Sequence, residues 1–299
     1  MVFDLLPSLR PCAKHATVCV RVSRRWEYRG GTDDGPIGLV DLVLIDQKAE
    51  IPRPEVETKA PLILEGGVYM ISRFKVSNAK FGYRLVLGEF MIEFTCYTRI
   101  EPMREDISDF PEYTYHLTSL ADLPARVGDT RSFIDVIGTL VEVSEVRTVH
   151  LPNKPAPTLT RDIVLMGLSN TDMKVTLWGH RASDFTIHDV YNAEDPRHVV
   201  VLLVGCLMKS FQGQDYLSAN TTCRWYFNPT IPEAEPFYSK LQHQRIEIRH
   251  VDAPAAEQAQ PQPLATPETM FLTDLESIDP YDFPLGSHVP LAFFVCTCL

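Results

Sequence analysis

Two aromatic residues stand at comparable places in the second half of the chain, each at the end of a strand-like segment. In "KVTLWG" (174–179), alternation at a period of two places Trp178 on the polar face of a strand. In "KSFQGQDY", Phe211 lies just before a turn and shares a face with Lys209. A ring beside a cation can stack on a nucleobase of any sequence while the cation pairs with phosphate. This pattern therefore predicts a groove for a single nucleic acid strand.

Basic residues near these rings are the candidate phosphate contacts. In the second half of the chain they are Lys209, Lys174, Arg161 and Arg147. The first half carries a similar hairpin, "SNAKFGYR", which contributes Phe81, Tyr83, Lys80 and Arg84. An earlier segment, "RVSRRWEYRGG", contributes Arg21, Arg24, Arg25 and Trp26, of which we expect Arg24 and Arg25 to contact the strand.

Each of these residues also has a plainer explanation. A single half-exposed ring on a β surface more often packs against its own fold than binds a ligand, and loop arginines are mostly solvated. The recurrence of ring and cation at both hairpins favours binding. His180, Asp184 and His188 recur every four residues and could share a helical face, which is compatible with a metal site. That segment is short, polar and without the glutamate of zinc hydrolases, so we predict no metal.

The sequence also favours a non-enzymatic protein. It contains no G-x-S-x-G elbow, no phosphate-binding Walker loop and no dinucleotide fingerprint. We therefore predict no catalytic residue and no cofactor, and an enzyme is the weaker alternative.

Strand patterns dominate and fall into two sets. The first set covers 17–28, 38–46, 68–76 and 83–95, and the second covers 132–146, 161–168, 174–179, 198–211 and 215–227. Helical patterns at 54–66 and 181–191 lie at equivalent places in the two sets. An offset of roughly 120 residues is typical of a duplicated domain. Five strands with a short helix between the third and fourth predict an OB-fold, a five-stranded Greek-key barrel that can bind oligonucleotides.

The predicted fold class is all-β with minor helix: two tandem OB-folds followed by a flexible C-terminal tail. The segment "VDAPAAEQAQPQPLATPET" is rich in Ala, Gln and Pro, which indicates a flexible linker. The expected boundaries are a first OB-fold at 1–105, a linker at 106–116, a second OB-fold at 117–240, a disordered linker at 241–268 and the truncated start of a third unit at 269–299.

Composition and charge restrict the class of protein further. The chain has 299 residues and a net charge of -11, of which the part after residue 240 carries -6 through eight acids against two arginines. Net charge therefore does not exclude nucleic acid for the first 240 residues. We expect no membrane association, because no apolar run reaches the roughly 18 residues of a membrane span. Seven scattered cysteines and no secretory signal indicate reduced thiols in the cytosol or nucleus.

Several ordered segments resemble a known family. "FIDVIGTLVEVSEV", "RDIVLMGLSNTDMKVTLWGHRASDF", "KSFQGQDYLSANTT" and "FNPTIPEA" resemble the second central DNA-binding OB domain of the replication protein A large subunit. The resemblance implies that Trp178 and Phe211 stack on bases of single-stranded DNA. It also implies a nuclear protein of DNA replication, repair and recombination, with other replication protein A subunits or repair proteins as partners.

The first unit resembles the preceding OB domain of that family in a divergent, plant-type form. "VYMISRFKVSNAKFGYR" and "EFMIEF" carry this match, and Tyr83 falls at a stacking position. The other stacking position falls near Pro52, where no ring is present. We expect the family's N-terminal recruiting domain and zinc-containing third OB domain to be missing. A degenerate OB protein that binds a protein partner and no DNA is the alternative function.

Overall fold

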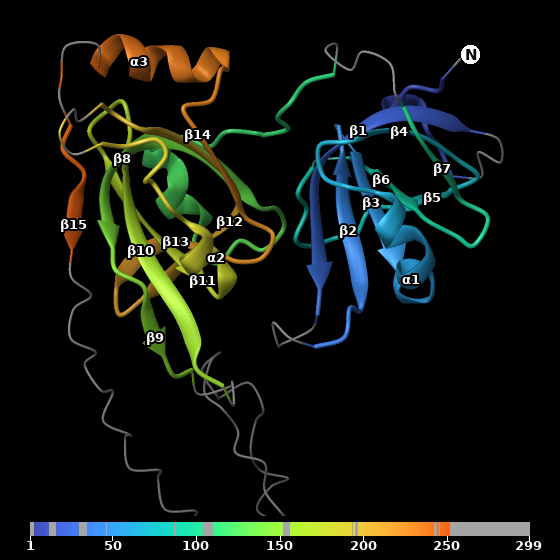
Figure 1. Ribbon diagram of the computed structural model, residues 1–299, viewed down its shortest axis with the longest axis horizontal. Coiled ribbons are helices and arrows are strands. Elements are labelled where there is room, and N and C mark those ends of the chain that lie inside the picture. The colour runs from blue at the N-terminus through green and yellow to red at the C-terminus, as the bar shows by residue number, and fades with distance from the viewer. Residues whose placement is uncertain are drawn as a thin grey trace, which may run out of the picture. The chain divides into compact units, whose positions relative to one another are not determined.

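Strands dominate the computed structural model of this protein, and β-branched and aromatic residues are frequent in them (Figure 1). The structure describes residues 3–251 apart from gaps at 12–15, 30–34, 46, 87, 104–109, 152–155, 193, 195–196, 242–243 and 245. The expected start of a third unit at 269–299 therefore lies outside the described residues. In the described part of the chain, no helix is long and apolar enough to cross a membrane.

The first unit is a curled sheet in the strand order β5-β6-β3-β2-β1-β4-β7. Its strands are β1 (Thr17–Tyr28), β2 (Leu39–Leu44), β3 (Gln47–Pro52), β4 (Val68–Ser72), β5 (Lys75–Asn78), β6 (Phe90–Glu93) and β7 (Arg99–Pro102). The short helix α1 (Val56–Lys59) follows the third strand and lies between 3-10 turns at Arg53–Glu55 and Ala60–Leu62. β3 and β6 pair in parallel, while all other pairs in this sheet are antiparallel.

The second unit repeats this connectivity. Its strands are β8 (Ile134–Ser144), β9 (Arg147–Val149), β10 (Thr158–Met166), β11 (Asp172–Trp178), β12 (Val200–Phe211), β13 (Gln214–Ala219), β14 (Arg224–Phe227) and β15 (Arg249–Val251). β12 pairs with both β13 and β8, which closes the sheet into a barrel. β11 and β13 pair in parallel, as β3 and β6 do in the first unit. The helices are α2 (His180–Asp184) and α3 (Glu235–Leu241).

Two hydrophobic cores stabilise the second unit. The barrel interior is filled by side chains such as Ile163, Val175, Leu177 and Leu217, all fully buried. The outer side of β12 forms another cluster with α3, into which Tyr113, Tyr115 and Leu117 also pack. Part of the expected linker thus belongs to the second unit because its aromatic residues cover this outer cluster.

The second unit also extends beyond the expected boundary at residue 240. Ile248 is buried in the barrel core, and Arg249–Val251 pairs in parallel with Glu142–Ser144 of β8. These contacts supply the backbone partners that a disordered linker would lack.

Three other segments differ from the sequence patterns. The expected strand at 83–95 is a loop followed by the short β6, and β3 is a strand that no pattern indicated. β3 forms because β2 and β6 supply partners on both of its sides. The expected helix at 181–191 ends with α2 at Asp184, since Phe185 adopts an extended conformation and its ring packs in the core against Trp225 and Phe227.

Candidate nucleic-acid interface

Strand register brings most of the predicted residues of the second unit to one outer face. On neighbouring strands, directly opposite residues point to the same side of the sheet. Thr160 lies opposite Trp178, and Asp162 lies opposite Thr176. Continuing across the parallel pair and the β12–β13 hairpin, the same face carries Trp178, Lys174, Arg147, Lys209, Tyr216 and Phe211. The opposite face carries the barrel core.

The two predicted rings both reach the surface of this face. Phe211 is 66% exposed at the end of β12, and Trp178 is half-buried at the end of β11. A hollow of about 710 Å³ is lined in part by Trp178, Lys209 and Tyr216. Stacking requires an uncovered π face, and Phe211 presents one beside the exposed cation Lys209.

The predicted cations of this face differ in their availability. Lys209 is exposed and makes no ion pair with any residue that the structure describes. Lys174 and Arg147 both pair with Asp162, at Nζ–Oδ2 3.0 Å and Nη2–Oδ2 2.8 Å. Arg147 also donates to the hydroxyl of Thr160. Lys209 is therefore the cation most open to a phosphate.

Arg161 does not join this group. It lies opposite Leu177, on the side of the sheet that faces the core, and its guanidinium donates to the backbone carbonyl of Phe185. Burial lowers the pKa of Arg161. Although the sequence predicts it as a phosphate contact, its side chain points away from the two rings, so we do not include it in the interface.

The hairpin of the first unit presents rings in a different setting. Phe81 and Tyr83 are 84% and 54% exposed in the long loop between β5 and β6. The backbone N–H of Tyr83 donates to the carbonyl of Thr130, and its ring lies 6.0 Å from that of Phe133. These contacts join the loop to the segment that precedes β8.

The two predicted cations of this hairpin are already engaged. Lys80 forms an ion pair with Glu50 on β3, and the Arg84 guanidinium donates to the backbone carbonyl of Lys80. Glu50 in turn stands beside Glu93 across the β3–β6 pair, so the corresponding face of the first barrel is partly acidic. Lys75 pairs with Glu93 and lowers its pKa through a hydrogen bond.

In the early basic segment of the first unit, Arg24 and Trp26 are buried, contrary to the sequence prediction for Arg24, whereas Arg25 is partly exposed and lines the same hollow as Trp178. Arg24 is 1% exposed and donates to the carbonyl of Thr114, while Trp26 packs against Val43 and Leu85. Arg25 pairs with Glu27. Arg24 cannot meet a phosphate in this arrangement because other side chains exclude solvent from it.

The stacking position that the resemblance assigned to Pro52 has no ring in the structure. Pro52 ends β3 as Trp178 ends β11, and each strand is followed by the short helix of its unit. A pyrrolidine offers no π face for a base. The first unit thus lacks a ring at this position, and the exposed rings of its hairpin are Phe81 and Tyr83.

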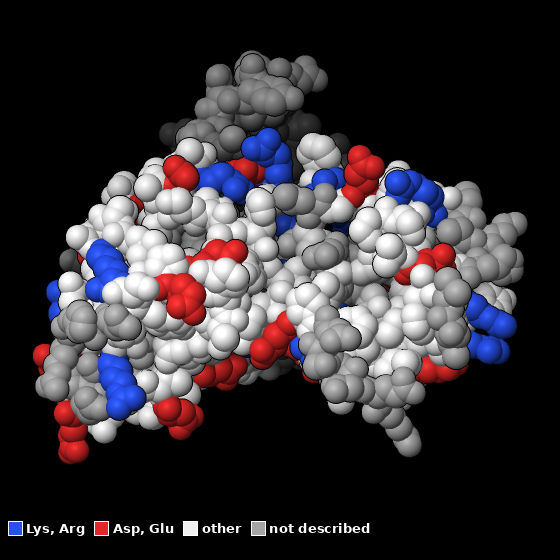
Figure 2. All heavy atoms as spheres, turned by 90° about the horizontal axis from the view of Figure 1, so that it is seen from above, with Lys and Arg blue, Asp and Glu red and all other residues white. Residues whose placement is uncertain are grey.

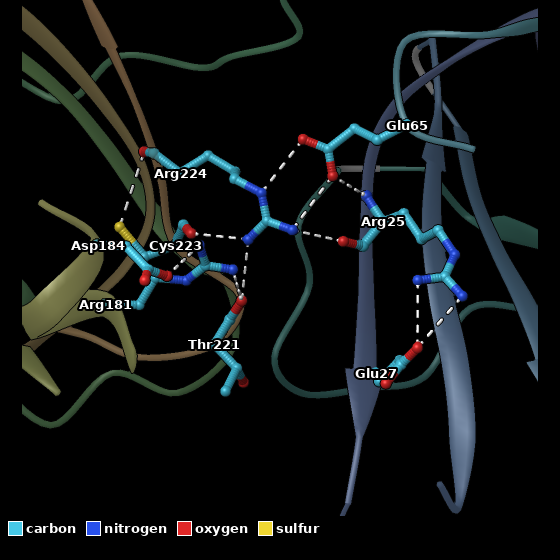
Figure 3. A network of polar contacts seen from close by, with 8 residues as sticks. All are labelled: Arg25, Glu27, Glu65, Arg181, Asp184, Thr221, Cys223 and Arg224. Carbon is cyan, nitrogen blue, oxygen red and sulfur yellow. Dashed lines mark hydrogen bonds and ion pairs between the residues drawn. The ribbon is translucent and has the colours of Figure 1, made fainter. Parts of the chain in front are cut away.

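Sequence reasoning missed an arginine that connects the two units (Figure 3). The guanidinium of Arg224 on β14 donates to the carboxylate of Glu65 at 3.2 and 3.1 Å and to the backbone carbonyl of Arg25. Nearby, the Arg181 guanidinium lies 5.8 Å from the centre of the Trp225 ring, and its burial lowers its pKa. No local pattern predicts the Arg224–Glu65 pair, because its members are far apart in the chain.

Charge on the surface is mixed. In the face drawn in Figure 2, basic and acidic side chains alternate over the described residues, and no continuous basic stripe crosses them. Among the described residues there is also no group of three or more metal-ligating side chains. His180 and Asp184 lie in α2, whereas His188 lies beyond its end. A binding role therefore depends on the individual rings and cations of the second barrel.

Known proteins share this architecture. The family model for the replication protein A OB domain matches residues 125–226. The chain is 27% identical over 234 residues to the replication protein A 70 kDa DNA-binding subunit of Xenopus laevis, covering 77% of this chain and 36% of that protein. It is 24% identical over 236 residues to a replication protein A 70 kDa DNA-binding subunit of Arabidopsis thaliana, covering 77% of this chain and 38% of that protein.

A solved structure extends the similarity to both units. A replication protein A heterotrimer bound to single-stranded DNA superposes with a TM-score of 0.57 at 25% identity, covering 82% of this chain and 57% of that chain. The expected resemblance to the replication protein A large subunit and the expected OB-fold are thus confirmed. The chain spans little more than a third of the length of the curated relatives it matches.

Proposed function

We propose that this chain, a relative of the replication protein A large subunit, binds single-stranded DNA through the outer face of its second barrel. The observation that carries the proposal is the common face shared by Trp178, Lys209 and Phe211. Rings that stack on any base and a cation that pairs with any phosphate provide binding without a strong sequence preference. The DNA-binding names of the relatives agree with this chemistry.

The first barrel plays a smaller part in the proposed binding. Trp26 and Arg24 are covered, Glu50 and Glu93 make its outer face partly acidic, and the position at Pro52 lacks a ring. Phe81 and Tyr83 remain exposed and could still add stacking at the hairpin. A weak second contact on the same strand would raise the overall affinity through its high effective concentration.

The cellular role follows from the same family. We propose that the chain acts in the nucleus, where it protects exposed strands during replication, repair and recombination. Its partners would be single-stranded DNA and other subunits or repair proteins. Binding and release of a strand need no bond breaking, so the proposed mechanism is passive and has no catalytic residue.

A different function would follow if the second barrel did not bind DNA. A degenerate OB protein could then act as a protein-protein interaction module, which the burial of Arg24 in the first unit favours. The two functions differ in one measurable property: DNA binding releases counterions and weakens with salt, whereas a protein module has no affinity for the strand.

The test is a titration of fluorescent oligo-dT followed by anisotropy at two salt concentrations. Lys209, the cation of this face without an ion partner among the described residues, would give a slope of log K against log salt near -0.7, the value for about one contact on a single strand. Affinity should therefore fall about threefold between ~50 and ~200 mM salt. An absence of binding at the lower salt concentration would support the interaction module.

A further inference from the structure

Asp162 is an acid placed on the face that is proposed to hold an acidic ligand. Along each strand, every second side chain lies on the outer face. The paired residues of neighbouring strands therefore form rows on this face, and successive rows are about 6.6 Å apart. Trp178 and Asp162 occupy neighbouring rows, Lys209 occupies the next row, and Phe211 the one after it. Asp162 lies on β10, which pairs with β11 on the side away from β13 and β12, so its carboxylate flanks a strand that touches both rings.

The carboxylate is held in place by a complete set of donors. Its Oδ2 accepts from Arg147 at 2.8 Å and from Lys174 at 3.0 Å, and its Oδ1 accepts from the Thr176 hydroxyl at 2.7 Å. Its own backbone N–H donates to the Ser144 hydroxyl at 2.9 Å. The Asp162 side chain is 17% exposed, so the ion pairs lie at the surface but have little freedom to move.

We propose that Asp162 limits the affinity of this face for single-stranded DNA by competing with phosphate for Arg147 and Lys174. The inference rests on the proposed function and describes how the same site is regulated. In the free protein one carboxylate pairs with both cations and offsets one of their two charges, so a phosphate must compete with it for their donors. The uncompensated charge of Asp162 then repels the strand. A binder limited in this way releases its strand more readily than the rings alone would allow.

Removing the negative charge should therefore strengthen binding. Asp162→Asn retains an oxygen for the Thr176 hydroxyl and releases both cations. Two additional exposed ion pairs with phosphate should raise the affinity for oligo-dT by about twofold to thirtyfold. The slope of log K against log salt should become more negative by about 1.4, the value for two further phosphate contacts on a single strand.

A matched control separates the local effect from the change in net charge. Asp122→Asn alters the net charge by the same amount, but Asp122 is exposed in the 3-10 segment Leu120–Arg126, outside the strands that form the outer face. The affinity of this control should match that of the unmodified chain. Unchanged or weaker binding by a folded Asp162→Asn protein, judged by circular dichroism, would overturn the inference.

A second comparison applies if Asp162→Asn does not fold. Lys174→Met removes a cation that is already paired with Asp162, whereas Lys209→Met removes one without an ion partner among the described residues. Lys174→Met should therefore cost less affinity than Lys209→Met, and the reverse order would refute the competition. If neither variant changes binding and Trp178→Ala with Phe211→Ala is also without effect, the proposed function itself fails. If only the ring variants weaken binding, the role of Asp162 alone is rejected.

Discussion

Removal of the two rings is the perturbation that addresses the interface most directly. Phe211→Ala and Trp178→Ala each delete one π face, and each stacked base contributes about 1–3 kcal/mol. The rings lie three rows apart, about 20 Å along the strands, and share no contact. Effects at such a distance are additive within about 0.5 kcal/mol. The double variant should lose about 2–6 kcal/mol, a weakening of about 30-fold to 10⁴-fold.

The two variants differ in what they should do to folding. Phe211 is 66% exposed, so its truncation should leave the free energy of unfolding within about 0.5 kcal/mol of the unmodified value. Trp178 is half-buried, and its truncation removes packing as well as a stacking surface. Phe211→Ala is therefore the cleaner probe of binding.

The assay is anisotropy of labelled oligo-dT at low salt, with urea unfolding of each variant measured alongside. Tyr97→Ala is the matched control, since Tyr97 is 74% exposed but lies in the first unit between β6 and β7. It should bind as tightly as the unmodified chain. Equal affinity of the double variant and the Tyr97→Ala control, with both proteins folded, would show that the rings do not contact DNA.

Two further outcomes follow from single side chains. Lys209→Ala should make the slope of log K against log salt less negative by about 0.7, the value for one phosphate contact on a single strand. Arg161→Gln should leave this slope unchanged because Arg161 faces the core side of the sheet. Equal effects of the two variants in the same titration would contradict this assignment. Burial, followed by the charge of Glu65, raises the pKa of Tyr226 to about 12, above its unfolded value near 10. Its contribution to stability is therefore complete below pH 10 and is lost as the pH rises to 12. Urea unfolding across this window should show a steeper loss for the unmodified chain than for Tyr226→Phe, by up to about 1.4 kcal/mol per pH unit, and parallel curves would reject the shift.

The alternation of side chains at a period of two was sufficient to predict which strand faces of the second barrel are buried. It assigns Trp178 to the face opposite Val175 and Leu177, and both aliphatic side chains are fully buried. The same rule places Arg161 with Ile163 on the core side. The prediction that Arg161 contacts phosphate was based on its positive charge and did not use its position in the alternation. Alternation works here because successive side chains of a strand must point to opposite sides of the sheet.

Properties that depend on strand register were outside the reach of the sequence. Asp162 meets Arg147 and Lys174 only because β9, β10 and β11 pair in one particular alignment. β3 has few strand-forming residues and is extended because β2 and β6 hydrogen-bond to it. Arrangements of this kind are decided by partners that are distant along the chain.

The sequence by itself determined two OB units and a ring at each end of the outer face of the second barrel, since strand periodicity and turn residues act locally. Tertiary structure alone decided which cations are already paired or covered. Arg24 is in a basic segment that looks exposed, yet it is buried against Thr114, a residue 90 positions later. Burial and ion pairing depend on the sum of such long-range contacts, and no local pattern contains that sum.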